Sequence, residues 1–349
     1  MSLVILTGIF FFAINNFICP VSSLSVNTSI FYYPWYGNPS SDGQWIKWTQ
    51  NDHKPPDDIA SNYYPVVGPY GSRNITVINQ HMDWLRSANI GIIIVSWWGP
   101  GWFGDFFVKD LLDAASNHGI RVTFHLEPYE TRTAYTIKSD MQYILANYGD
   151  HPALLRIARA TKWSNNTLSR PVFYAYRSVV VDDKNWAEML DGIRGTVWDV
   201  LLIAQTSTYL SIDTAHFDGI YLYDVYSLNG SNFQQLSDEC KQRNSIFSAT
   251  VGPGYTDIRA DNGSNRTKSR ENGQTYDFMW QEALDAKSEW VSITSFNEWL
   301  EGTNIEPATV KSTPTYDYMN FEGAYGKTGA EAEMAYLNRT VYWIKRFED

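Results

Sequence analysis

Short hydrophobic runs alternate with longer amphipathic stretches along most of this 349-residue chain. The runs are rich in β-branched and aromatic residues, as buried strands are, and the stretches between them have the length and polarity of helices. Strands that alternate with helices predict βα units and a parallel sheet. We predict strands at Ser29–Tyr33, Gly91–Ser96, Arg121–Leu126, Val172–Tyr176, Leu201–Gln205, Gly219–Tyr223, Ile246–Val251 and Ser292–Phe296, and helices at Val77–Ala88, Phe106–Asn117, Asp140–Tyr148, Trp186–Val197, Phe233–Arg243, Phe278–Lys287 and Ala330–Phe347.

Eight such strands predict a (β/α)8 TIM-type barrel of the α/β class. One barrel can fill a chain of this length, and the sequence has no linker and no internal repeat, so we expect a single domain over residues 26–349. The connection Trp35–Ile75 is polar and rich in proline and glycine, which predicts a loop at the rim. Catalytic groups of such barrels lie at the carboxyl ends of the strands.

The first 25 residues predict a targeting segment. Leu3–Cys19 is apolar and precedes Ser22 and Ser23, a pattern typical of a secretory signal peptide with a small-residue cleavage site. A short signal anchor is the alternative, because about 17 apolar residues is the lower limit for a membrane span. We expect membrane contact only if this segment is retained. Seven N-x-Ser/Thr sequons also fit a secretory protein, at Asn27, Asn74, Asn165, Asn229, Asn262, Asn265 and Asn338.

Charge and cysteine content exclude several classes of function. The formal net charge is −11 and there is no basic run, which argues against a nucleic-acid partner. The two cysteines, Cys19 and Cys240, form no Cys-x-x-Cys pair, so structural zinc is not expected. We expect neither a bound metal nor a cofactor.

The predicted strand ends are rich in aromatic residues and carboxylates and poor in Lys and Arg. This composition suits a neutral polyhydroxylated ligand, whose C–H faces stack on rings while carboxylates accept its hydroxyl protons. Strand alternation sends only one of Trp97 and Trp98 inward. Core packing is the alternative role for Tyr174, Tyr176, Tyr221 and Tyr223. The predicted ligand-binding residues are Tyr33, Trp35, Trp97, Trp98, Tyr176, Tyr223, Tyr255 and Asn297.

Glu298 and Glu301 follow the last predicted strand and are candidates for acid–base catalysis. If this segment turns as a helix, their spacing of three places both on one face. Two carboxyls in one partly dry pocket cannot both ionise freely, which is the pattern of glycosidases. The alternative is a solvated loop with two exposed glutamates. We expect Glu306 to be solvated or structural.

His125 and Glu127 lie two apart in a predicted strand and therefore point the same way. We predict that they bind sugar hydroxyls, with a satisfied core histidine as the alternative for His125. A metal site would need a third ligand, which the sequence does not place nearby. Glu127 is unlike a core residue because an unpaired charge inside a barrel is costly.

Several of these stretches resemble the glycoprotein endo-α-1,2-mannosidases of glycoside hydrolase family 99, and most closely the animal Golgi enzymes. The resemblance implies a metal-free barrel that cuts an internal α-1,2-mannosidic bond of glucosylated N-glycans with retention, and a place in the Golgi lumen or, alternatively, secretion. The similar stretches are FYYPWYGNP (31–39), HKPPDDIASNYYP (53–65), SWWGP (96–100), VTFHLEPY (122–129), FDGIYLY (217–223), VGPGY (251–255) and ITSFNEWLEGTNIEP (293–307).

The resemblance also implies residue roles. Glu298 matches the residue that deprotonates the substrate's own 2-hydroxyl, Glu301 matches the general acid and base, and Glu127 matches a carboxylate that binds sugar hydroxyls. Leu300 departs from the family's usual histidine, and the rim loop is shorter between Trp48 and His53. Two alternatives remain open: a catalytically silent carbohydrate-binding protein of the secretory pathway, and a related barrel hydrolase that acts on mannan.

Overall fold

The eight predicted parallel strands close into a barrel in the computed structural model, which describes residues 24–349 apart from residue 166. β1 lies between β3 and β12, with Ser29 opposite both Ile92 and Ser292. The pairing of β4 with β6 closes the ring, and the predicted (β/α)8 fold is therefore confirmed. The barrel strands are β1 (Thr28–Tyr32), β3 (Ile92–Trp97), β4 (Arg121–Leu126), β6 (Ser169–Ala175), β7 (Leu201–Gln205), β8 (Gly219–Tyr221), β9 (Ile246–Val251) and β12 (Trp290–Ile293).

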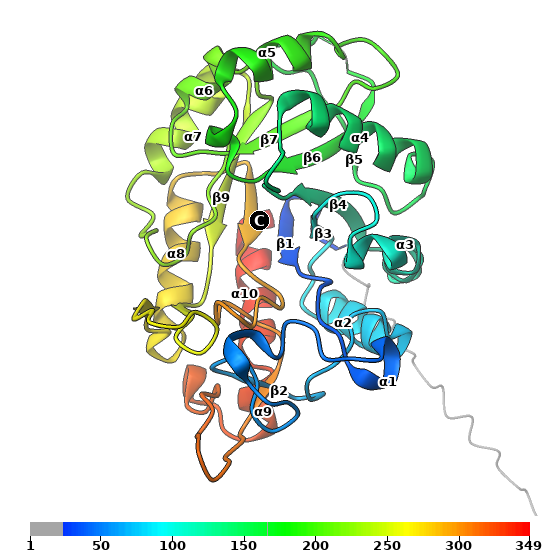
Figure 1. Cartoon of the computed structure of the whole chain (residues 1–349). Coiled ribbons are helices and arrows are strands. Elements are labelled where there is room, and N and C mark those ends of the chain that lie inside the picture. Colours follow the sequence, from blue (N-terminus) through cyan, green and yellow to red (C-terminus); the bar gives the residue numbers. More distant parts are fainter. Residues whose placement is uncertain (1–23, 166) are drawn as a thin grey trace, which may run out of the picture.

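Helices surround the barrel on all sides (Figure 1). Helix α2 shows why they form. Asn74 caps it by accepting a hydrogen bond from Thr76 N, and the buried residues within it recur at helical spacing and face the strands. The helices are α1 (Pro39–Asp42), α2 (Ile75–Ser87), α3 (Val108–Asn117), α4 (Ala134–Tyr148), α5 (Asp183–Asp191), α6 (Leu210–Thr214), α7 (Phe233–Gln242), α8 (Gln274–Asp285), α9 (Ala330–Glu333) and α10 (Ala335–Glu348), and 3-10 turns occupy Gln50–Asp52, Phe103–Phe107, Ser178–Val180, Glu271–Gly273 and Ala324–Gly326.

Some predicted bounds differ from the structure. α4 begins at Ala134 rather than Asp140, because Thr133 and Thr136 form a capping box. The short α6 was not predicted. β8 and β12 end two or three residues early, at Tyr221 and Ile293, because the chain leaves the ladder there to build the mouth of the barrel.

The long loop after β1 is partly a core element, which corrects the predicted polar rim. Trp48 within it is fully buried and donates its indole N–H to Tyr70 O at 2.8 Å. The loop is fastened to the segment after β12 by an antiparallel pair of short strands. The minor strands are β2 (Tyr64–Pro65), which pairs with β13 (Ala308–Thr309), β5 (Arg156–Ala158), which pairs with β6, and the ribbon of β10 (Tyr255–Thr256) and β11 (Thr267–Lys268).

The predicted targeting segment falls almost entirely within residues 1–23, outside the described residues. From residue 24 onward, the structure holds no helix that is both long and apolar enough to cross a membrane. Six of the seven sequon asparagines are exposed, and Asn27 is half-buried beside Glu348, to which its amide donates at 3.5 Å.

Candidate active site

Glu298 and Glu301 lie on a tight turn after β12, at the carboxyl end of the barrel strands. Gly302 N donates to Trp299 O at 3.3 Å, so the segment forms a turn, and the helix that would place both glutamates on one face is not formed. Gly302 has a φ of +58°, and a Cβ there would lie 2.8 Å from Thr256 O, so only glycine fits this position. The turn brings both carboxylates into the mouth, close enough for the charge of Glu301 to act on Glu298.

Glu298 is 2% exposed and is held at two points. Its backbone N–H donates to Ser295 Oγ at 2.8 Å, and its Oε1 accepts from Leu300 N at 3.1 Å. Burial raises the pKa of Glu298 well above its usual value, and the charge of Glu301 raises it further. The charge of Lys47 opposes this shift.

Glu301 is only partly buried by its neighbours and lies among other carboxylates. Burial raises the pKa of Glu301 to about 7, and the charges of Asp224 and Asp257 contribute, against the opposing charge of Arg266. A carboxyl with this pKa holds its proton into the neutral range, which is the property of a general acid.

Asn297 and Trp299 are held in place by hydrogen bonds with three tyrosines. The Asn297 amide accepts from Tyr33 N at 2.7 Å and donates to Tyr33 O at 3.1 Å and to Tyr70 Oη at 3.2 Å. Tyr36 Oη accepts from Trp299 N and donates to Asn297 O, both at 3.0 Å. The amide of Asn297 is thus used by the protein itself, and the structure places it as an anchor of the mouth rather than as a ligand contact.

Glu306 is the centre of a buried network beneath this turn. It is fully buried, which contradicts the solvated alternative and agrees with the structural one. Its carboxylate accepts from Tyr70 Oη at 2.7 Å and Trp299 Nε1 at 2.9 Å, and it lies 3.1 Å from His81 Nε2. The other nitrogen of His81 contacts Tyr32 Oη at 3.0 Å. The network therefore ties α2 and the rim loop to the catalytic turn, a link that sequence spacing did not indicate.

His125 and Glu127 form the predicted pair at the end of β4. Glu127 Oε1 accepts from Ser96 Oγ at 2.8 Å and lies 2.9 Å from His125 Nδ1. The second nitrogen of His125 lies 2.5 Å from Tyr221 Oη. Each of the two side chains thus has polar partners within the protein. The alternative role of His125, a core histidine whose hydrogen bonds are satisfied, therefore also agrees with the structure. Within 24–165 and 167–349 no three His, Cys, Asp or Glu side chains are grouped so as to hold a metal ion.

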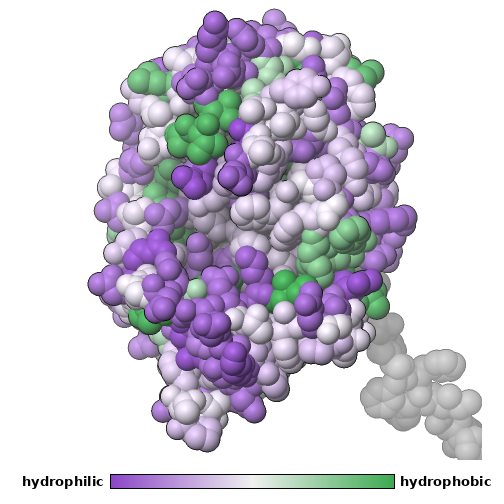
Figure 2. All heavy atoms as spheres, in the orientation of Figure 1, coloured by the Kyte–Doolittle hydropathy of each residue, from purple (hydrophilic) through white to green (hydrophobic). Residues whose placement is uncertain are grey.

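The tyrosines of the mouth face the carboxylates. Tyr33 and Tyr223 share a hydrogen bond between their hydroxyls. Burial raises the pKa of Tyr33, and the charges of Glu127, Glu298 and Glu301 raise it further, so all three carboxylates lie around this ring. In Figure 2 the barrel opens as a hollow lined mainly by pale, weakly hydrophilic residues, with strongly hydrophilic ones at its edge.

Two other predicted tyrosines also lie close to Glu301. Burial raises the pKa of Tyr176 and of Tyr255, and in both cases the charge of Glu301 contributes. The ring of Tyr176 packs 4.9 Å from that of Tyr223, and Tyr255 Oη donates to Asp257 at 2.8 Å. Both residues therefore border the mouth on the Glu301 side.

Trp97 and Trp98 point to opposite sides, as strand alternation predicts. Trp97 is 1% exposed, donates its indole N–H to Asp105 at 3.0 Å and stacks on Tyr143 of α4. The structure thus contradicts its prediction as a ligand-binding residue: it belongs to the core between barrel and helices. Trp98 is partly exposed and donates to Ser96 Oγ at 3.2 Å, close to Glu127.

The charged side chains that surround the two candidate glutamates were not predicted from the sequence. Lys47 Nζ lies 4.2 Å above the ring of Trp35, which packs 4.9 Å from Tyr33. Lys47 therefore supplies a cation to a mouth that we expected to contain almost none. Asp224 and Asp257 follow β8 and β10, and their position directly after strands was the one signal that could have revealed them.

Comparison with known proteins gives a consistent result. The family model of glycosyl hydrolase family 99 matches residues 23–349. The glycoprotein endo-alpha-1,2-mannosidase of Rattus norvegicus is 38% identical, over 91% of this chain and 74% of that protein. The glycoprotein endo-alpha-1,2-mannosidase-like protein of Homo sapiens is 37% identical, over 94% of this chain and 78% of that protein.

A solved structure agrees with this assignment. The GH99 endo-alpha-mannosidase from Bacteroides thetaiotaomicron superposes with a TM-score of 0.82 at 35% identity, over 93% of this chain and 98% of that chain. The resemblance seen in the motifs is therefore confirmed, and this chain belongs to glycosyl hydrolase family 99.

Proposed function

We propose that this chain is a retaining endo-α-1,2-mannosidase that cleaves glucosylated high-mannose N-glycans and releases a Glc-Man disaccharide. The observation that carries the proposal is the pair of adjacent glutamates whose surroundings differ. Glu298 is enclosed and faces a lysine, whereas Glu301 is partly exposed and faces two aspartates. The names of the rat and human relatives support the bond and the substrate class.

In the proposed mechanism, Glu298 is the base and Glu301 the acid. Glu298 takes the proton from the mannose 2-hydroxyl, and the freed oxygen attacks C1 as the bond from C1 to the leaving oxygen breaks. Glu301 gives its proton to that leaving oxygen. Water, deprotonated by Glu301, then opens the 1,2-anhydro sugar at C1, and O2 regains a proton from Glu298. Two inversions at C1 give net retention.

The remaining residues bind the sugar or hold the site. Glu127, with His125, is placed to accept hydroxyl protons, since its Oε1 is already oriented by Ser96. Asn297 and Trp97 hold the mouth in place. The stacking or hydroxyl contacts come from Tyr33, Trp35, Trp98, Tyr176, Tyr223 and Tyr255.

We further propose that residues 1–25 direct the chain into the secretory pathway, most simply to the Golgi lumen, and that 26–349 form one barrel domain. The exposed sequon asparagines favour a lumenal protein. Expression in eukaryotic cells, followed by N-terminal sequencing and glycosidase treatment, tests this part. An unprocessed Met1 in the membrane fraction would favour the anchor form.

The function is tested by incubating the purified protein with a glucosylated high-mannose N-glycan and sizing the released sugar by mass spectrometry. The proposal predicts a dihexose together with a glycan shortened by two hexoses. Release of single hexoses would contradict endo cleavage. Binding without any release would favour the carbohydrate-binding alternative.

A further inference from the structure

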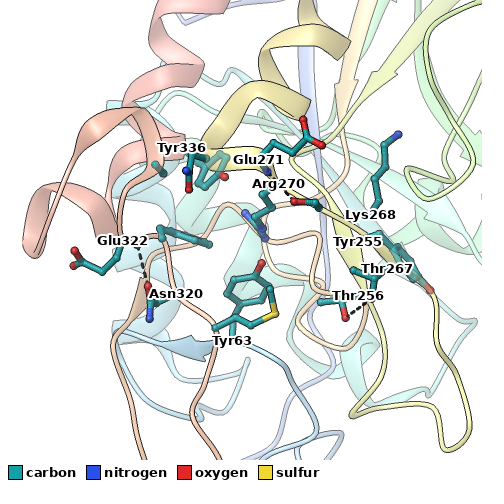
Figure 3. Close-up of a pocket in the computed structure, with 15 residues that line it drawn as sticks. Tyr63, Tyr255, Thr256, Thr267, Lys268, Arg270, Glu271, Asn320, Glu322 and Tyr336 are labelled. Carbon is teal, nitrogen blue, oxygen red and sulfur yellow. Dashed lines mark hydrogen bonds between the residues drawn. The ribbon is translucent and has the colours of Figure 1, made fainter.

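A second cavity is lined in part by the β10–β11 ribbon, whose Tyr255 also borders the mouth (Figure 3). It has a volume of about 370 Å³, at the lower end of the range for small-molecule sites. Tyr255 and Thr256 form the wall between cavity and mouth, and Thr256 N donates to Glu301 O at 2.8 Å. A ligand in this cavity would therefore lie next to the catalytic turn.

Arg270 in the cavity wall has hydrogen-bond donors that the protein leaves unused. The residue is 8% exposed, and its Nη2 donates to Gly302 O at 2.9 Å and Asn304 O at 2.7 Å. Its Nε and Nη1 have no hydrogen-bond partner among the described residues. They lie instead among the rings of Tyr63 and Phe321, whose centroids are 4.5 and 4.7 Å from the guanidinium carbon. These rings cover both nitrogens, so Arg270 holds the cavity wall in shape by its contacts with the rings and with the turn after β12.

The other lining groups favour a neutral hydroxylated ligand over an anion. Glu271 and Glu322 are exposed at the cavity and would repel a carboxylate or phosphate. Lys268 is engaged, since its Nζ donates to Val225 O at 3.0 Å. Asn320 lines the cavity and accepts from Glu322 N through its Oδ1, so its amide NH₂ is the group left to act as a donor (Figure 3). A sugar hydroxyl can accept from Asn and donate to Glu at the same time.

We propose that this cavity is a second sugar-binding site, which takes a mannose residue from another branch of the glycan whose α-1,2 bond is cut in the mouth. This rests on the proposed function. A branched glycan held in the mouth would gain affinity from a second contact on the same molecule, because binding at the linked site is intramolecular. The sequons Asn262 and Asn265, on the loop that joins β10 to β11, offer the protein's own glycan as another source of the same chemistry.

The test measures the activity of the wild-type enzyme and of cavity variants on two substrates. One is a branched glucosylated high-mannose glycan, and the other is a linear Glc-Man-α-1,2-Man glycoside that has no further branch. Asn320→Ala removes a cavity donor, and Asn320→Trp fills the space with an indole. The matched controls are Asn185→Ala and Asn185→Trp, on the exposed surface of α5.

We expect Asn320→Ala to lower kcat/KM on the branched glycan by about threefold to tenfold through KM, and Asn320→Trp by at least about tenfold. On the linear substrate both should stay within twofold of wild type. Equal effects on the two substrates, or none on either, would overturn the proposal. If Asn320→Trp does not fold, Asn320→Ala still decides.

Two further arms separate the alternatives. Removal of both ribbon sequons by Asn262→Gln and Asn265→Gln should leave the preference for the branched substrate unchanged, and its loss would assign the cavity to the protein's own glycan. In the Glu301→Gln variant, a branched α-1,3/α-1,6-mannotriose should bind more weakly once Asn320→Ala is added. Binding of glucuronic acid in place of the mannotriose would make the cavity an anion site.

If the wild-type enzyme cleaves neither substrate, the proposed function fails. If it cleaves both substrates without the predicted difference among the variants, only the proposal of a second sugar-binding site fails.

Discussion

The two sides of the mouth use the same residue type in opposite surroundings. On the Glu298 side, the carboxylate is enclosed, accepts a backbone hydrogen bond and faces a cation. On the Glu301 side, the carboxylate is partly exposed and faces two anions and a surface arginine. We call these the base side (Lys47, Trp35, Ser295, Glu298, Leu300) and the acid side (Asp224, Tyr255, Asp257, Arg266, Glu301).

This difference teaches that two glutamates three residues apart differ in the charges around them as well as in their burial. A cation near Glu298 favours its ionised form, whereas anions near Glu301 favour its protonated form. Burial is the largest cause of both raised pKa values, and the charge of Glu301 raises the pKa of Glu298 further than Lys47 lowers it, so Glu298 is best able to act as a base while Glu301 holds its proton. The predictions below remove one part of this arrangement at a time.

Loss of either carboxyl should have the largest effect. We expect Glu298→Gln and Glu301→Gln each to lower kcat on the natural glycan by about 10²–10⁴-fold, because an amide can neither accept nor donate the required proton. Thermal denaturation should show both variants folded. Either variant with near-normal turnover would remove that residue from the proposed mechanism.

Removal of the Asn297 side chain, which anchors the mouth behind both glutamates, should have the second largest effect. Asn297→Ala leaves Tyr33 N without its partner in a buried place, which should cost about 1–3 kcal/mol of unfolding free energy and reduce kcat. Chemical denaturation measures the first effect and steady-state kinetics the second. An unchanged kcat would show that the mouth does not depend on this anchor. Asn185→Ala, on an exposed helix, is the control.

The acid side sets the alkaline limit of activity. Since Glu301 must hold its proton and burial raises its pKa to about 7, kcat should fall as pH rises through about 7. Asp224→Asn removes an anion that raises this pKa, so the alkaline limb should move to lower pH by about half a unit to one unit. The pH profile of kcat measures the shift, with the exposed Asp150→Asn as control. Movement to higher pH would contradict the assignment.

The base side sets the acidic limit. Glu298 must be ionised, and Lys47→Met removes the cation that lowers its pKa, so the acidic limb should move to higher pH by a similar amount. Lys54→Met, the same change at an exposed position of the same loop, should move neither limb. Asp224→Asn should narrow the pH profile of kcat from the alkaline side, and Lys47→Met should narrow it from the acidic side. If Lys47→Met shifted the alkaline limb instead, the two roles would be reversed.

The smallest effect should separate the two tryptophans. Trp98→Phe should raise KM severalfold, because Trp98 is partly exposed near Glu127, whereas Trp97→Phe should lower stability by about 1 kcal/mol with little change in KM. Kinetics and thermal denaturation on the same preparations measure both. A larger KM change in Trp97→Phe would return that residue to the binding site.

The sequence predicted the barrel well because each strand is a short apolar run between amphipathic stretches. It could not place strand ends that leave the ladder, such as Tyr221 and Ile293, since the residues beyond them remain aromatic or buried. Strand alternation predicted that Trp97 and Trp98 point to opposite faces of the strand, but it did not predict which of them faces the helices.

The two glutamates were predictable from their spacing after the last strand. Their tuning groups were not, because Lys47, Asp224 and Asp257 come from loops far apart in the chain. Glu306 was undervalued for the same reason: its partners come from α2 and the rim loop.

The division of labour between Glu298 and Glu301 is tested most directly with a Glc-Man fluoride, whose leaving group departs without a proton. Turnover of this substrate should be compared with turnover of the natural glycan for both Gln variants. We predict that Glu301→Gln loses far less activity on the fluoride than on the glycan, whereas Glu298→Gln loses activity equally on both. Rescue of Glu298→Gln instead of Glu301→Gln by the fluoride would contradict the assignment of base and acid.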